Sequence, residues 1–140
     1  MKIVAALLAC LTATRAQHVL IGYPPEGANL TAGHTTTIEI QRPNFQSSSE
    51  EVAIVLGITS CPNTPCPAPA DTMGHILHNG PFDPKEHPLT PLIQPYQNFT
   101  VELPGDLPKG NGQLNVYHVA LIGESFVPFT ETLTTSVFVN

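Results

Sequence analysis

Apolar and polar residues alternate along this chain in short runs that are typical of β-strands. Residues 35–42, 96–103, 113–123 and 131–139 repeat an apolar residue at every second position, which is the period of a strand with one buried face. Residues 52–59 are apolar and largely β-branched throughout, as expected for the central strand of a core. Each of these runs therefore predicts a strand.

Two shorter apolar runs, residues 18–23 and 71–77, bring the number of predicted strands to seven. Residues 81–95 contain five prolines, too many for a helix or an interior strand, and predict a long stiffened loop. No stretch keeps a helical period over three turns. The pattern predicts an all-β fold: a single antiparallel β-sandwich of immunoglobulin-like type with about seven strands. Because the chain has no tryptophan, this likeness to antibody domains is one of architecture only.

The first sixteen residues have the pattern of a signal peptide. Lys2 precedes an apolar run at residues 3–11, and small residues stand at the expected cleavage site after Ala16. We expect a secreted, extracellular protein with one domain at residues 17–140. The apolar run is too short to cross a bilayer, so no membrane insertion is expected.

Removal of the leader leaves three cations, Arg42, Lys85 and Lys109, against eleven carboxylates, hence a net charge of −8. So acidic a protein is a poor partner for nucleic acid or for an anionic membrane. Cys61 and Cys66 are the two cysteines that remain, and in an oxidising compartment they predict a disulfide. Asn29 and Asn98 each begin a glycosylation sequon, and Asn98 falls on the polar face of its strand.

Candidate chemistry is sparse. His75, His78 and His87 lie near one another in sequence, but residues three apart on a strand point to opposite faces, so solvated histidines are expected rather than a metal site. The adjacent acids Glu50 and Glu51 precede a strand and are expected in a solvated loop. We expect no enzyme activity and no cofactor.

A copper site remains the second alternative. An N-terminal histidine can chelate copper through its free amine, as in copper-dependent polysaccharide monooxygenases. His18 would be that residue only if cleavage followed Gln17, and this would leave larger residues at positions that favour small ones.

Phenylalanines gather in three loops that a sandwich would bring to one end, at residues 43–50, 79–95 and 124–129. Aromatic side chains anchor protein interfaces, and proline-rich loops lose little entropy on binding. Either these rings form a partner-binding surface, or they fold inward and close the end of the core. The four residues are Phe45, Phe82, Phe126 and Phe129.

Several ordered blocks of the sequence resemble the necrosis-inducing secreted proteins, a family of fungal effectors. The blocks are residues 51–57, 60–61, 65–66, 73–82, 95–101, 112–114, 118–123 and 128–133. The resemblance implies a non-catalytic secreted protein that enters plant tissue, induces cell death and suppresses host immunity by binding immune receptor-associated kinases. No functional residue is transferred by it. An extracellular cell-wall or carbohydrate-binding module is the first alternative, although such modules use planar rows of aromatic residues. The sequence leaves the oligomeric state open.

Overall fold

The computed structural model describes residues 18–44, 48–89 and 94–140 and confirms an all-β sandwich. The leader expected at residues 1–16 and the candidate anchor Phe45 lie outside the described residues. Eight strands form two sheets within the described chain, and that part contains no helix. Their bounds are β1 Leu20–Tyr23, β2 Ala28–Leu30, β3 Thr35–Gln41, β4 Ser49–Ser60, β5 His75–Gly80, β6 Tyr96–Glu102, β7 Gly110–Ile122 and β8 Val127–Val139.

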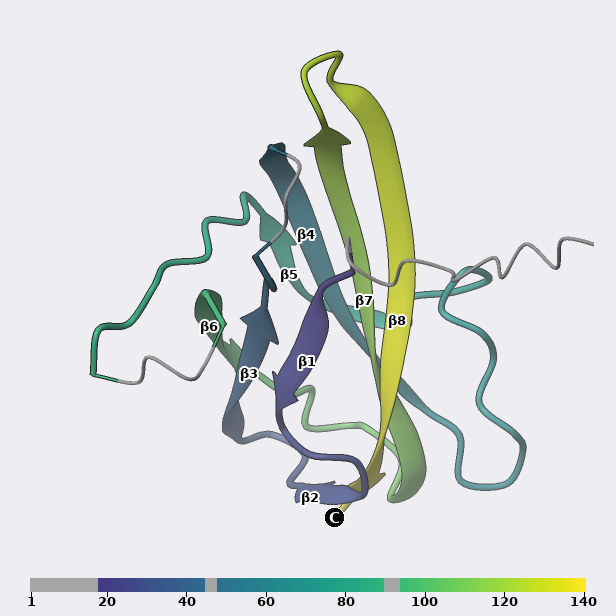
Figure 1. Ribbon diagram of the computed structural model, residues 1–140. Helices are drawn as coiled ribbons and strands as arrows, with labels where there is room; N and C mark the ends of the chain where they lie inside the picture. The colour runs from purple at the N-terminus through teal and green to yellow at the C-terminus, as the bar shows by residue number, and fades with distance from the viewer. Residues whose placement is uncertain (1–17, 45–47, 90–93) are drawn as a thin grey trace, which may run out of the picture.

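A three-stranded sheet in the order β1-β3-β6 packs against a five-stranded sheet in the order β2-β8-β7-β4-β5 (Figure 1). The five-stranded sheet is built around the long hairpin of β7 and β8, which pair over all thirteen residues of each strand. Apolar side chains of both sheets meet between them and form one core. Its most buried members include Ile38, Ile40, Ile54, Leu56, Ile58, Leu103, Leu114, Val116 and Val139.

The inward and outward faces follow the predicted alternation in most strands. In β6, for example, Phe99 and Val101 are buried, whereas Asn98 is exposed. Asn29 is also exposed, so both sequon asparagines lie on the surface. Both remain predicted glycosylation sites.

The strand β2 is an addition to the predicted set, and it changes the topology. Its three residues pair in parallel with Val137–Val139 of β8, so the sandwich is not purely antiparallel. The sequence did not predict β2 because its three residues are too few to show an alternating pattern. The strand predicted at residues 71–77 is also shifted, since β5 begins at His75 and ends at Gly80.

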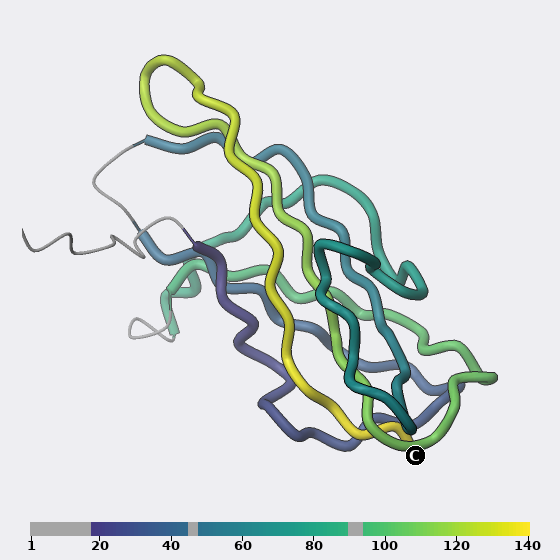
Figure 2. The backbone as a smooth tube through the Cα atoms, turned by 90° about the vertical axis from the view of Figure 1, so that its right-hand side faces the viewer, coloured from purple at the N-terminus to yellow at the C-terminus, as the bar shows by residue number. Residues whose placement is uncertain are grey.

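The segment between β4 and β5, residues 61–74, covers the outer face of the five-stranded sheet (Figure 2), and we call it the covering segment. A disulfide joins Cys61 to Cys66 within it, with their Cα atoms 5.3 Å apart. On β7, Gln113 donates a hydrogen bond to the Pro67 carbonyl, and Asn115 donates one to the Met73 carbonyl at 3.2 Å. The covering segment therefore supplies acceptors for the side-chain amide N–H groups of Gln113 and Asn115, which the sheet would otherwise bury without these partners.

Gly57 permits this close approach. A Cβ atom at position 57 would collide with the carbonyl group of Met73. The residue is glycine because the backbone of the covering segment occupies the space of a side chain.

Candidate functional site

The expected aromatic cluster divides into buried and exposed members. Phe82 is only 3% exposed, and its ring packs against those of Phe99 and His118 at centroid distances of 6.4 and 5.6 Å. Of the two alternatives left open by the sequence, the inward one therefore describes Phe82, because its ring closes the core. Phe129 is half-buried on the inward face of β8, where its ring lies near that of His118. Phe126 is 57% exposed.

Phe126 belongs to the turn that joins β7 to β8, at the tip that projects furthest at the top of Figure 1. Its φ angle is +51°, a left-handed conformation that residues other than glycine seldom adopt. The turn is closed by a hydrogen bond from the Phe126 N–H to the Gly123 carbonyl. Val127, also 57% exposed, follows directly. We call this tip, residues 123–127, the hairpin tip.

Beside the hairpin tip, the start of β4 completes the surface at this end of the sandwich. A hollow of about 500 Å³ lies between residues 48–50 and the turn residues Gly123, Glu124 and Phe126. The Gly123 N–H donates to the Ser48 carbonyl at 2.8 Å, which ties the turn to the neighbouring strand. The turn that carries the exposed Phe126 is therefore held in place by hydrogen bonding to the neighbouring strand.

Beneath this surface lies a cluster of charged side chains that sequence reasoning did not find. His118, on the inward face of β7, is 0% exposed. Its Nε2 hydrogen-bonds to Glu51, and its Nδ1 lies 2.8 Å from Oε1 of Glu131. Arg42 donates from Nε to Glu51, and His18 meets the second oxygen of Glu131. We call these five residues the charged cluster.

A β-bulge turns Glu51 into the interior. Glu51 pairs with Ala120 and Ala53 pairs with Val119, so Val52 is the extra residue. Regular alternation outward from buried Ile54 would place Val52 inside and Glu51 outside; instead Val52 is 45% exposed and Glu51 faces His118. The expectation that Glu51 lies in a solvated loop is therefore wrong, whereas Glu50 is exposed as expected.

The cluster joins both sheets. Arg42 directly follows β3 in the three-stranded sheet, while Glu51, His118 and Glu131 belong to β4, β7 and β8 of the other. Glu131 also accepts a hydrogen bond at 2.9 Å from the backbone N–H of Val19, just before β1. The charged cluster therefore connects the N-terminal segment and β3 to the five-stranded sheet.

Both nitrogens of His118 face carboxylates, which requires the doubly protonated imidazolium. Burial disfavours that charged form, but the hydrogen bonds and negative charges of Glu131 and Glu51 outweigh burial and raise the pKa of His118. Burial likewise opposes ionisation of Glu51 and Glu131. Hydrogen bonds from His118 and Arg42 nevertheless lower the pKa of Glu51. Hydrogen bonds from His118 and the Val19 N–H lower the pKa of Glu131.

The shifts predict a stability optimum in mild acid. The contribution of His118 is complete below its ordinary pKa of 6.5 and is lost as the pH rises through its raised folded value. The contributions of Glu51 and Glu131 are complete above 4.5 and are lost as the pH falls through their lowered values. We expect the melting temperature to be highest between pH 4.5 and pH 6.5 and to fall on both sides. Thermal unfolding at a series of pH values measures this dependence.

The variant His118→Gln provides the control for the alkaline side. Glutamine does not titrate, so the melting temperature of this variant should lack the decline that begins above pH 6.5 in the wild type. An unchanged alkaline decline in His118→Gln would assign it to other groups.

The histidines considered for metal binding are engaged separately. His78 packs its ring 4.6 Å from that of Phe99, His87 stacks at 3.8 Å on Tyr96, and His75 is exposed. His18 shares Glu131 with His118, whose two nitrogens both meet carboxylates. Across residues 18–44, 48–89 and 94–140, no three histidine, cysteine or acidic side chains form a group suited to a metal ion.

The described part of the chain also contains no helix with the length and apolar character needed to cross a bilayer.

Comparison with known proteins gives a family and a distant structural likeness. No curated protein matches the sequence. Among solved structures, a cellulose-active polysaccharide monooxygenase from M. thermophila has a TM-score of 0.45 and 15% sequence identity, covering 81% of this chain. This chain matches 54% of the length of that structure.

The family comparison agrees with the resemblance carried by the sequence blocks. The family model named Nis1 matches residues 14–138, nearly the whole chain and all eight strands except the last residue of β8. This protein therefore belongs to the Nis1 family, consistent with the necrosis-inducing secreted fungal effectors that its sequence resembles.

Proposed function

We propose that this protein is a secreted effector that acts by binding a host protein, without catalysing a reaction. Membership of the Nis1 family supports the effector role. The proposed partners are plant immune receptor-associated kinases, the class that the family resemblance implies. By occupying such a kinase, the protein would suppress the immune response that the kinase transmits.

The exposed hairpin tip is the observation that carries the binding proposal. Phe126 is 57% exposed, stands in a left-handed conformation and is followed by the equally exposed Val127. An aromatic side chain that already stands in solvent at a braced turn needs little reorganisation to fill a pocket on a partner. The hollow beside it, lined by residues 48–50, offers space for a side chain of that partner.

The charged cluster supports a binding role over catalysis. His118 is fully buried, and each of its nitrogens is engaged by a carboxylate, so a substrate in solvent does not reach it. The proposal therefore assigns the cluster to holding the sheets beneath the hairpin tip.

Of the three tyrosines, Tyr23 on β1 and Tyr96 on β6 belong to the three-stranded sheet, whereas Tyr117 on β7 belongs to the five-stranded sheet, so no single sheet carries all three. A planar row of aromatic residues is what the alternative carbohydrate-binding module would use.

Capture of kinase domains by the secreted protein tests this proposal. The wild type should retain purified plant receptor-associated kinase domains, and Phe126→Ala should weaken that binding by about tenfold or more, as for a central aromatic anchor. The matched control is Phe138→Ala: Phe138 is 45% exposed but lies near the opposite end of β8. Equal weakening by both variants would contradict the hairpin tip as the contact, and retention on insoluble polysaccharide instead of kinase would favour the alternative module.

A further inference from the structure

The strand β8 has a long edge without a strand partner in the part of the chain that the structure describes. On one side, β8 pairs with β7 throughout. On the other side, β2 pairs only with Val137–Val139, and a hydrogen bond from the Gly27 N–H to the Ser136 carbonyl extends that contact by one residue. Residues 127–135 therefore form an open edge, longer than many complete strands.

The pairing shows which backbone groups face this open edge. Ser136 directs its carbonyl toward the side of β2, and residues of an antiparallel strand alternate between their two neighbours. Because the pairing of β7 with β8 has no register shift, Thr134, Thr132 and Thr130 direct their N–H and carbonyl groups the same way. The open edge thus presents a regular row of donors and acceptors.

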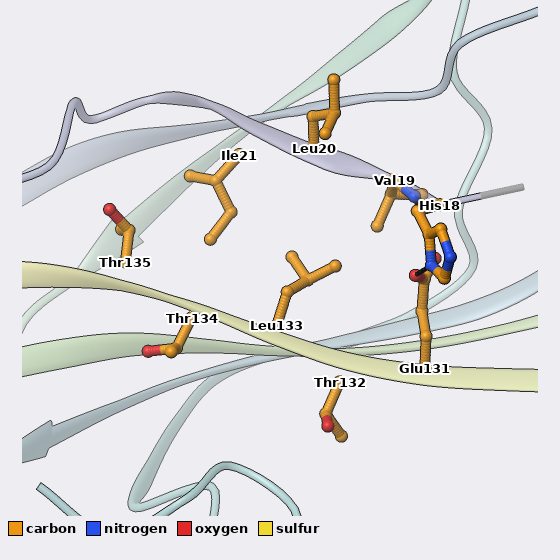
Figure 3. Close-up of a pocket in the computed structure, with 9 residues that line it drawn as sticks. All are labelled: His18, Val19, Leu20, Ile21, Glu131, Thr132, Leu133, Thr134 and Thr135. Atoms are coloured by element: carbon orange, nitrogen blue, oxygen red, sulfur yellow. Dashed lines mark hydrogen bonds and ion pairs between the residues drawn. The ribbon is translucent and has the colours of Figure 1, made fainter. Parts of the chain in front are cut away.

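A hollow lies on each face of the sheet at this edge. The inner hollow, about 660 Å³, lies between residues 18–21 and residues 131–135. In Figure 3, Ile21 and Leu133 point toward each other across it. The outer hollow, about 440 Å³, lies between residues 130–132 and the covering segment, with Met73 and Tyr117 in its wall. Both hollows include Glu131 and Thr132.

Few of the features that protect sheet edges occur here. Proteins block open edges with lysines, bulges, prolines or covering segments. Within the open edge, Pro128 is the one proline and lies near its start, whereas residues 129–135 contain no lysine, arginine or proline. The pairing with β7 contains no bulge. The one charged residue, Glu131, faces inward to His118 and the Val19 N–H. The backbone N–H and carbonyl groups of this edge are thus available to pair with another strand.

We propose that the open edge at Thr130–Thr134 binds an extended peptide segment of a partner protein as an added strand. Alternate side chains of a bound strand point to opposite faces, so they would enter the inner and outer hollows in turn. The apolar walls of the hollows select apolar side chains at those positions. The acidic net charge, −6 for the full sequence and −8 without the expected leader, favours a segment flanked by lysine or arginine. This inference rests on the proposed function, in which the segment belongs to the host partner.

A phage-displayed library of short linear peptides tests the edge directly. We expect the wild type to select peptides with alternating apolar residues and basic flanks. Thr132→Pro removes one edge-facing N–H without removing a hydrogen bond to β7, and should weaken the selected peptides by about tenfold. Thr132→Ala keeps that N–H and should bind like the wild type. Equal binding to both variants, or selected peptides without the alternating pattern, would overturn the proposal.

Amide hydrogen exchange of the wild type gives a second measurement that needs no variant. The N–H groups of Thr130, Thr132 and Thr134 should exchange rapidly in the free protein and become protected by a selected peptide. Protection already present in the free protein would show that the edge is covered by the chain itself, or by a second copy if dilution removes it, and either result would overturn the proposal. Peptide binding without kinase capture would leave the edge site intact and contradict only the proposed function.

Discussion

Replacing Glu51 with alanine should reduce the free energy of unfolding by about 3–5 kcal/mol, the usual effect of removing one partner from a buried ion pair. Glu51 lies between His118, which is 0% exposed, and Arg42, which is 5% exposed. Without the carboxylate, His118 can release its proton, but the guanidinium of Arg42 keeps its charge at any pH that proteins tolerate. The large effect therefore comes mainly from the charge of Arg42.

The neighbouring Glu50 gives a matched control, because it is the same residue type, one position away, and exposed. Glu50→Ala should change stability by no more than about 0.5 kcal/mol. Denaturant unfolding monitored by circular dichroism measures both variants. Similar losses in the two would mean that the charged cluster does not stabilise the fold.

The second large effect is expected for Phe82→Ala, which should reduce the free energy of unfolding by about 3–5 kcal/mol. The side chain of Phe82 is 3% exposed and fills the space beside the rings of Phe99 and His118. Truncation would leave a cavity between the sheets and expose one side of the charged cluster. Thermal and denaturant unfolding should show the loss directly.

Phe126→Ala is the control for that measurement, since Phe126 is 57% exposed and should contribute little to stability. The two variants thus separate the alternatives that the sequence left open: Phe82 closes the core, whereas Phe126 remains available to a partner. If Phe126→Ala unfolded as readily as Phe82→Ala, the hairpin tip would have a structural role instead.

Local alternation was sufficient to predict much of the sandwich. The faces of residues 35–42 and 96–103 follow their pattern because one side of each strand packs on the core and the other meets solvent. The strand β2 could not be predicted in this way, since it depends on pairing with β8, more than a hundred residues away. Phe82 was assigned to a loop because residues 81–95 contain five prolines, yet its ring is buried by side chains distant in sequence.

The charged cluster was less accessible to sequence reasoning, although one signal was present. His118 lies among apolar residues on the inward face of its strand, and Glu131 has the same parity as the inward residues Leu133 and Val137. Two ionisable residues on the inward faces of adjacent strands could have suggested a buried pair. Glu51 offered no such signal, because the bulge at Val52 reverses its side and depends on the pairing with β7.

The long hairpin determines how this protein can be attached to a surface for binding measurements. The backbone of Asn140 is fixed beside β2 through hydrogen bonds with Leu30 and Ala32. Figure 1 shows this C-terminus at the opposite end of the molecule from the hairpin tip. Thirteen residues of β8 at about 3.3 Å each separate the two ends by roughly 40 Å. A protein immobilised through its C-terminus would therefore present Phe126 away from the support.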